Sequence, residues 1–162
     1  MTQVKEPRFV LPGSAPHHSS GCKWLDADPN LEVSATVMIR RPAAAGDISD
    51  QLLAGTLPAR PRAEVEKSLT ADASDMQTIK NFMREYRLTV VTESAVARTV
   101  RVTGTIAQMD AAFGVDVKWL IDEQGRKYLS YTGEISLPEA LSGVVQAVLG
   151  LDQRPVARPA TA

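Results

Sequence analysis

The 162-residue sequence has too few residues of several types to build the common kinds of active site. A single cysteine, Cys22, excludes an internal disulfide framework and a cysteine-rich zinc site. The two histidines, His17 and His18, lie in a stretch rich in proline, glycine and serine, which we expect to be solvated. A catalytic histidine must be held by packing and oriented by a third group, so this pair is a poor general base. We therefore expect no catalytic residue, metal site or cofactor in this chain.

The sequence also lacks an excess of charge of one sign and any long apolar run. Eighteen Lys and Arg balance nineteen Asp and Glu, for a formal charge of −1, which gives no global field for nucleic acid or an anionic membrane. Nowhere do eighteen apolar residues run together, and the first residues lack the apolar stretch of a classical secretory signal. We expect neither nucleic acid nor membrane as a partner, and the residues themselves assign no compartment.

The hydrophobic content of 44% is enough for one globular domain with its own core. Apolar and polar residues alternate from Leu31 to Arg41, which predicts a half-buried strand. A three-and-four spacing of apolar residues between Asp72 and Tyr86 predicts an amphipathic helix. The other elements expected in the first two thirds of the chain are a short helix over 62–69 and two antiparallel strands over 88–92 and 98–105.

The last third of the chain carries clear local signals. Thr105 and Gln108 have the spacing of a capping box for a helix from Ile106 to Phe113, and Gly114 stands where a left-handed residue ends a helix. A hairpin follows, with strands over 115–121 and 127–131. Apolar residues at helical spacing between Pro138 and Gly150 predict a final helix.

The resulting order is strand, helix, strand, strand, helix, strand, with a hairpin strand and a helix appended. It predicts an α+β fold, a ferredoxin-like sandwich in which helices pack on one face of an antiparallel sheet. We expect a flexible or irregular segment over residues 1–28, the domain itself over 29–151 with a long excursion near 42–70, and a C-terminal linker over 152–162. This fold hosts many functions, so it assigns none by itself.

A set of short segments occurs in a fixed order along the chain: Leu11-Pro-Gly-Ser, Asp28-Pro-Asn-Leu-Glu-Val, Arg40-Arg41, Ala71-Asp-Ala-Ser-Asp-Met, Leu88-Thr-Val-Val, Arg98-Thr-Val-Arg-Val-Thr-Gly-Thr, Ala111-Ala-Phe-Gly-Val, Tyr128 to Gly133, and Leu149-Gly-Leu-Asp-Gln-Arg-Pro. Together they resemble the activation domain that precedes the catalytic domain of sedolisin- and kumamolisin-type serine-carboxyl peptidases. One departure is Arg87, where the family usually has glycine after the long helix. Because a non-glycine residue is strained in a left-handed cap, we expect the helix to end differently here.

The resemblance implies a propeptide that assists the folding of a peptidase and inhibits it until cleavage at acidic pH. Its partner would be the cognate catalytic domain, in cis or in trans, and the family suggests an exported enzyme. The sequence given stops at Ala162, before the Ser, Glu and Asp triad and the calcium site of the family. We therefore expect no peptidase activity from this chain and calcium only in the absent catalytic domain. An isolated domain of this kind could also pair with a second copy through an edge strand.

The residues singled out for the interface or the linker are Arg98, Tyr131, Arg154, Pro155, Arg158 and Pro159. For Arg98 the sequence favours a structural role at the sheet edge over contact with a partner. Trp119 shares the parity of Val115 and Val117 and is expected in the core, whereas Tyr131 fits core and interface about equally.

Two alternatives from other classes stay open at this stage. The first is a stand-alone inhibitor that acts on such peptidases in trans. The second, more remote, is a ferredoxin-like module that binds nucleic acid or a metabolite, although the strand from Arg98 to Thr105 lacks the aromatic residues on which bases stack.

Overall fold

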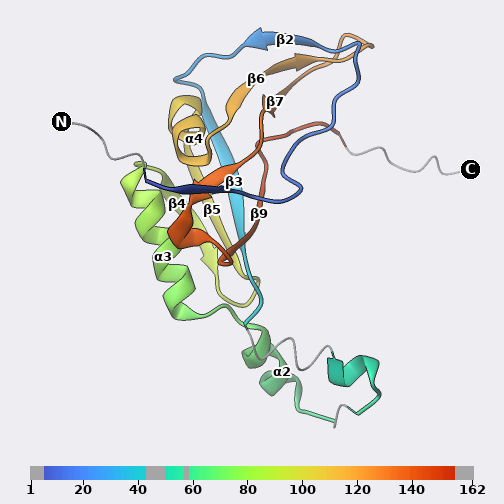
Figure 1. Ribbon diagram of the computed structural model, residues 1–162, viewed down its shortest axis with the longest axis vertical. Coiled ribbons are helices and arrows are strands. Elements are labelled where there is room, and N and C mark those ends of the chain that lie inside the picture. Colours follow the sequence, from blue (N-terminus) through green and yellow to red (C-terminus); the bar gives the residue numbers. More distant parts are fainter. Residues whose placement is uncertain (1–5, 43–49, 57–58, 156–162) are drawn as a thin grey trace, which may run out of the picture.

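A computed structural model describes residues 6–42, 50–56 and 59–155 of the chain. Its elements occur in an order that alternates strands with a few helices (Figure 1). Besides a helical turn at residues 50–53, the helices are α2 (Arg62–Leu69), α3 (Ala73–Glu85) and α4 (Ile106–Phe113), with a short 3-10 helix over Glu139–Leu141. The strands are β1 (Arg8–Val10), β2 (Lys23–Asp26), β3 (Glu32–Ile39), β4 (Thr89–Ser94), β5 (Thr99–Thr105), β6 (Asp116–Ile121), β7 (Lys127–Thr132), β8 (Ser136–Pro138) and β9 (Val145–Leu149).

The main sheet has four strands in the order β4-β5-β3-β9, and every neighbouring pair is antiparallel. Along the chain these strands and the two packed helices follow one another as β3, α3, β4, β5, α4 and β9. This is the strand order and connectivity of a ferredoxin-like sandwich, so the predicted α+β fold is confirmed. The segment between α4 and β9 is an insertion into this fold, and its strands β6, β7 and β8 pair outside the main sheet.

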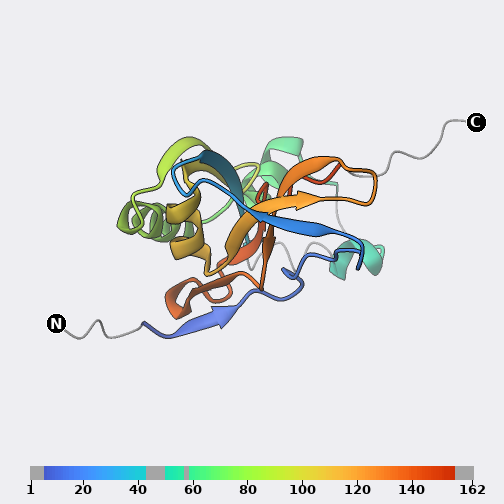
Figure 2. The ribbon, with the colours of Figure 1, turned by 90° about the horizontal axis from the view of Figure 1, so that it is seen from above.

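The core lies between one face of the main sheet and the helices α3 and α4. Alternate residues of β3, from Val33 to Ile39, are buried, as are Val100 and Val102 of β5. The apolar stripe of α3 faces them, and both helices lie on the same side of the molecule (Figures 1 and 2). The two-residue period of the strands and the helical period of α3 therefore bury the residues that the sequence pattern predicted.

Helix α3 ends in a left-handed residue although no glycine is present. Arg87 adopts φ 57°, its N–H donates to the carbonyl of Arg84 at 3.1 Å, and the N–H of Leu88 donates to the carbonyl of Met83 at 2.8 Å. These two bonds are those of a Schellman motif. The expectation that the helix ends differently is thus wrong, because burial of Leu88 against the core holds the turn in place.

Helix α4 begins and ends as the sequence predicted. The Thr105 hydroxyl accepts a bond from the Gln108 N–H, and the Gln108 side chain accepts one from the Thr105 N–H. Gly114 closes the helix at φ 67°, and a Cβ there would lie 2.1 Å from the Ser136 hydroxyl. The position therefore requires glycine both for its backbone angle and for the space available.

The predicted helix between Pro138 and Gly150 is wrong. Only Glu139–Leu141 forms a single 3-10 turn, and β9 follows as the fourth strand of the main sheet. Gly143 at φ 73° and Gly150 at φ 97° bound the strand, and its valines are β-branched residues that favour strands. Their spacing suits a helix as well, because a β-bulge opposite Met38 and Ile39 shifts the alternation of β9.

The hairpin of β6 and β7 is confirmed, but it does not join the main sheet. It pairs with β2 to form a three-stranded sheet in the order β2-β6-β7. Val117 and Leu120 are buried on its two faces. Trp119, expected in the core, is only partly buried, and the Lys127 ammonium lies 4.5 Å from its ring centroid.

The N-terminal segment, expected to be irregular, contributes ordered structure over its described part. Strand β1 pairs with β8, and β2 is an edge strand of the second sheet. Leu11 is buried, and the His18 ring packs edge-on against Trp24 at 4.8 Å between centroids. This histidine is therefore half-buried rather than solvated. Its packing was not visible in the sequence because Trp24 is held in place by the pairing of β2 with β6, a strand far along the chain.

The excursion expected near 42–70 contains α2, whose bounds match the predicted short helix. None of the residues of α2 is buried. In Figure 1 the helix lies below the main sheet, beyond the end of α3. Residues 43–49 and 57–58 of this excursion lie outside the described residues.

Two arginines with left-handed backbones give a matched test of the strain in this fold. Replacing exposed Arg87 by glycine should raise the free energy of unfolding by up to about 1 kcal/mol, because glycine tolerates the positive φ. Arg98, at φ 56°, also donates to the Ile39 carbonyl at 3.0 Å, so Arg98→Gly should give no gain. Urea unfolding followed by circular dichroism measures both, and equal effects of the two changes would contradict this account.

Candidate functional site

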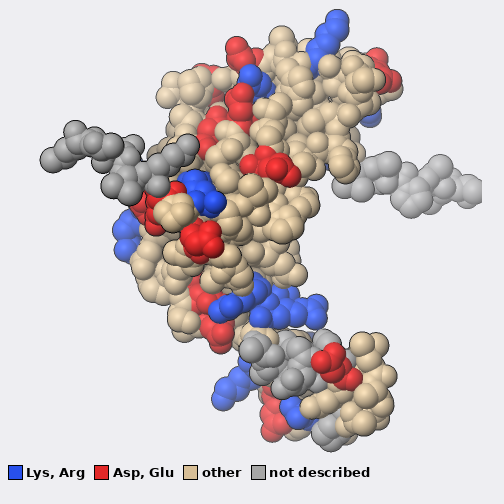
Figure 3. Space-filling model, in the orientation of Figure 1, with Lys and Arg blue, Asp and Glu red and all other residues tan. Residues whose placement is uncertain are grey.

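The described residues offer no group of three or more His, Cys, Asp or Glu side chains placed to hold a metal ion. In the same part of the chain, no helix has the length and hydrophobicity needed to cross a bilayer. The surface in Figure 3 carries acidic and basic side chains interspersed on a mostly uncharged background. The faces and edges of the sheets are candidate surfaces for binding another protein.

One such surface is the face of the main sheet that points away from α3 and α4, here called the open face. Thr36 of β3 pairs with Arg101 on one side and with Leu149 on the other, and Arg101 pairs in turn with Thr92 of β4. These four residues form a row across the whole sheet, with Leu149 52% exposed. Neighbouring rows add Ser34, Met38, Thr99 and Thr103, so the open face is rich in hydroxyl groups.

Basic side chains gather at the end of the main sheet nearest α2, as Figure 3 shows in blue. Arg40 donates from Nε to Oδ2 of Asp75 at 2.7 Å and from Nη2 to Oδ1 at 3.1 Å. Asp75, in the first turn of α3, is buried, and this ion pair raises the pKa of Arg40. The pair therefore ties the end of β3 to α3, whereas Arg41 is exposed.

Arg98 lies at the turn between β4 and β5, where its side chain crosses the end of the sheet. Its guanidinium donates to the carbonyl of Ile39 at 3.0 Å and to Oε1 of Gln146 at 3.5 Å. It thus joins the ends of β5, β3 and β9. Its left-handed backbone, at φ 56°, means that Arg98 does not continue the alternation of β5.

Tyr131 is buried on β7, and its hydroxyl donates to the backbone carbonyl of Ser14. Burial raises the pKa of this phenol, and Asp152 nearby adds to the effect. The N–H of Ile135 donates to the Ser14 hydroxyl at 2.9 Å. Tyr131 therefore fixes the N-terminal segment against the second sheet.

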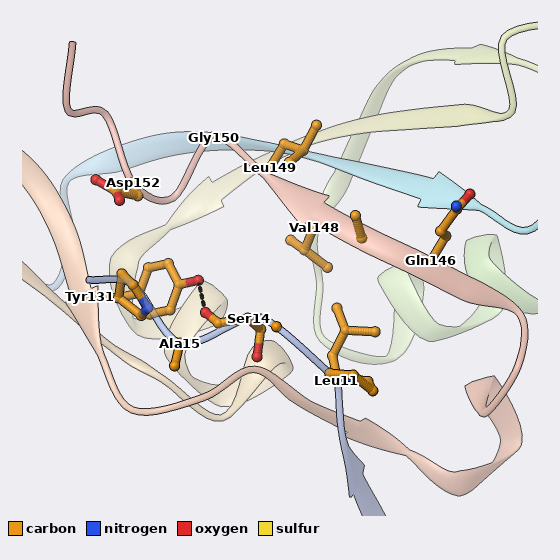
Figure 4. Close-up of a pocket in the computed structure, with 13 residues that line it drawn as sticks. Leu11, Ser14, Ala15, Tyr131, Gln146, Val148, Leu149, Gly150 and Asp152 are labelled. Atoms are coloured by element: carbon orange, nitrogen blue, oxygen red, sulfur yellow. Dashed lines mark hydrogen bonds between the residues drawn. The ribbon is translucent and has the colours of Figure 1, made fainter. Parts of the chain in front are cut away.

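A groove runs between β9 and the segment from Leu11 to Pro16, with a volume of about 280 Å³ (Figure 4). Leu11 and Val148 face each other across it, and Tyr131 and Asp152 lie at one end. Because β9 is the last strand of the main sheet, this groove follows a free sheet edge.

The chain leaves the domain at a fixed point. Leu151 is buried, and the N–H of Gln153 donates to the carbonyl of Leu129 at 2.8 Å. The Arg154 guanidinium forms an ion pair with the Asp152 carboxylate, whose two oxygens lie 2.9 and 2.8 Å from Nε. The same guanidinium also donates to the backbone carbonyl of His17. The linker predicted from residue 152 is therefore anchored at its first residues.

Of the other predicted linker residues, Pro155 follows the anchor and is exposed. Arg158 and Pro159 lie outside the described residues. The structure brings Tyr131 and Arg154 close together, since both bond to the N-terminal segment, at Ser14 and at His17. Arg98 lies apart from them, at the turn between β4 and β5. Sequence reasoning missed the free edge of β9 as well, since it predicted that segment as a helix.

The family model described as "Pro-kumamolisin, activation domain" matches residues 25–154. The chain belongs to this family. Kumamolisin from Bacillus sp. (strain MN-32) is 30% identical over 165 residues, which cover 96% of this chain and 29% of that protein. Tripeptidyl-peptidase sed5 from Aspergillus fumigatus is 26% identical over 166 residues, which cover 90% of this chain and 29% of that protein. The chain thus spans less than a third of the length of these relatives, and the resemblance in the sequence is confirmed.

The anchor at Arg154 predicts a specific dependence of stability on pH. Burial alone would raise the pKa of Asp152, but the hydrogen bonds and charge of Arg154 outweigh it and hold this pKa below its ordinary value. A depressed pKa adds stability above the unfolded value near about 3.9, and the gain is lost as the pH falls through the folded value. Asp152→Asn should therefore lower Tm at neutral pH and converge with the parent chain in strong acid.

Asp110 provides a control of opposite sign. Burial raises its pKa even though its carboxylate accepts a bond from the Val117 N–H at 2.9 Å. The raised pKa means that ionisation of Asp110 lowers the stability of the folded chain. At neutral pH, Asp110→Asn should therefore lower Tm by less than Asp152→Asn does. Thermal unfolding of the three chains between neutral and acidic pH decides this, and a pH-independent loss in Asp152→Asn would count against the anchor.

Proposed function

We propose that this activation domain is a non-catalytic propeptide that docks on a peptidase catalytic domain, assists its folding and inhibits it until acid allows release. The observation that carries the proposal is the open face, a broad sheet surface within a domain of the pro-kumamolisin activation family. We infer no cofactor for this chain, and an extracellular location follows if its partner is an exported acid-acting peptidase.

The open face has the composition of a surface that another protein covers. Arg101 is exposed at its centre, and Leu149 and Val91 are each 52% exposed at its two edges. Val91 occupies the β-bulge of β4, which turns its side chain out of the regular alternation. Hydroxyl groups and Arg101 cover most of this face, while Met38, Leu149 and Val91 add apolar contacts, so the sheet offers a flat platform for helices of a partner.

A preformed platform of this kind can assist folding. A partner that is slow to form its own core gains buried contacts as soon as one of its elements settles on the sheet. Binding to the native partner and not to its unfolded chain then shifts the equilibrium towards the native state. The rigid four-stranded sheet, held by the Arg40–Asp75 pair and the core, is suited to this role.

Inhibition follows from the anchored exit of the chain. Once the open face is docked, the linker beyond Pro155 starts from a fixed place, because Arg154 ties its first residues to the domain. Proline disfavours helix in the residue before it, so the linker enters the peptidase as an extended chain. An extended peptide lying in a substrate cleft blocks it by occupancy.

Acid provides the release. The chain carries nineteen Asp and Glu, and exposed carboxylates titrate near about pH 4. Protonation removes their attraction to basic groups across an interface, while all eighteen Lys and Arg keep their charge. A stand-alone inhibitor acting in trans would use the same surface. That alternative differs only in whether the domain and the peptidase are encoded as one chain, and the mechanism of inhibition is the same.

The decisive experiment titrates the purified chain into mature kumamolisin and follows peptide cleavage at near-neutral and acidic pH. We expect inhibition at near-neutral pH that is lost on acidification, and inhibition of equal strength at both would contradict acid release. Absence of inhibition at both would contradict docking itself.

Charge reversal on the open face tests where the partner binds. Arg101→Glu places an acidic group at the centre of the face and should weaken inhibition at least about tenfold. Arg84→Glu makes the same change on an exposed part of α3, where the Arg84 guanidinium donates to the Asn81 side chain, and should leave inhibition unchanged. The inhibition constant of each folded variant is the measurement. Equal effects of the two variants would move the interface away from the open face.

A further inference from the structure

The free edge of β9 carries main-chain groups with no partner strand. The N–H of Ile39 donates to the carbonyl of Arg98 at 2.8 Å, so the odd-numbered residues of β3 bond towards β5. The even-numbered ones therefore bond towards β9, as Arg40 does when its N–H donates to Val144 at 2.8 Å. Thr36 is paired with Leu149, and Met38 with Ala147, so these two pairs carry the hydrogen bonds between β3 and β9. Val148 lies between them, opposite Val37 in a pair without hydrogen bonds, and its N–H and carbonyl are directed away from β3.

Val148 is only 9% exposed, so its outward main-chain groups lie in a confined place. Within the described residues they receive no backbone or side-chain hydrogen bond from the groove side. Buried N–H and carbonyl groups without a partner are costly and are normally satisfied by another chain or by water. The main chain of Val148 is thus a ready pairing point in the groove of Figure 4.

The opposite wall of the groove cannot supply that partner, because its own bonds point elsewhere. The N–H of Leu11 donates to the carbonyl of Ile135 at 2.8 Å, and Ser14 is held by Tyr131 and Ile135. The wall stands beside β9 without pairing to it, and about 280 Å³ remains between them. The main-chain groups of a helix are bonded within the helix, whereas an extended chain can bond to a free strand edge, so the outward groups of Val148 suit an extended chain.

The chemistry of the groove selects an uncharged segment. Leu11 and Val148 supply apolar contacts, and Asp152, its one charged lining residue, is already neutralised by Arg154. The β9 strand of a second copy carries its own Leu11–Pro16 wall along the same edge, and two such walls would collide before the strands could pair. The groove therefore favours a protruding loop of a different protein over a copy of this chain.

The position of the groove identifies that protein. Leu149 follows Val148 and projects onto the open face, whereas Val148 projects to the core side, so the groove and the open face share the strand β9. A partner seated on the open face reaches the edge of β9 without leaving its surface. We propose that the groove receives an extended, uncharged loop of the peptidase catalytic domain, which adds to β9 as a short strand and bonds to the main chain of Val148. This inference rests on the docking proposed above.

Two substitutions at Val148 distinguish the contribution of its main-chain N–H to binding from that of its side chain. Val148→Pro removes the outward N–H while leaving the bonds of its neighbours to β3, as proline does at sheet edges. Val148→Ala truncates the side chain more and keeps the N–H. We expect the proline variant to inhibit mature kumamolisin about tenfold more weakly, and the alanine variant to stay within a few-fold of the parent chain.

Hydrogen exchange of the parent chain provides a second measurement that does not depend on the folding of a variant. The Val148 amide should exchange readily in the free chain and become protected on addition of mature kumamolisin. Inhibition by the parent chain without such protection, or equal inhibition by the proline and alanine variants, would overturn the groove proposal and leave docking on the open face intact. Failure of the parent chain to inhibit would overturn both.

Discussion

The structure depends on the pairing of β3 on both of its sides, with β5 along one edge and β9 along the other. A strand in the middle of a sheet has no freedom of register once one of its faces is buried, because a shift by one residue would turn its apolar side chains into solvent. Val33, Ala35, Val37 and Ile39 fix that face. The helices must then lie on the same side, and the other side is left as the hydroxyl-rich open face. The surface proposed for docking is thus a direct result of how the core is built.

The segment between α4 and β9 adds what the simple sandwich lacks. It forms the second sheet with β2, pairs β8 with β1, and holds the N-terminal segment through Tyr131 and Ile135. That segment becomes a wall beside β9 instead of a further strand on it. Without the wall, β9 would be an ordinary exposed edge, open to pairing with any copy of the chain. With it, the edge lies in a groove, which is the feature that the proposed pairing with an extended loop depends on.

Features encoded within a few residues could be predicted from the sequence, and features encoded across the chain could not. The capping box of Thr105 and Gln108 and the left-handed Gly114 depend on local geometry, so α4 was predicted with its correct ends. The strand β9 was predicted as a helix because valines at a three-and-four spacing fit either structure, and its pairing with β3 decides between them. The roles of Tyr131 and Arg154 depend in the same way on Ser14 and His17, which lie more than a hundred residues away. The free edge of β9 became visible only once that strand was placed.

The modest chemistry of the open face favours an inhibitor that is covalently joined to its target. A face of hydroxyl groups with one arginine, Met38 and two apolar groups at its edges has no aromatic residue among those named above, and aromatic anchors dominate tight interfaces. Docking of a free chain must also offset the translational and rotational freedom that it loses. When the two proteins share one chain, a linker supplies an effective concentration in the millimolar range, and weak contacts hold. Cleavage of that linker ends this advantage at once. Protonation of carboxylates at the same pH then needs to weaken the contacts only slightly for the domain to leave. Under the proposed function, a face of moderate affinity therefore suffices to inhibit before cleavage and to release the peptidase after it.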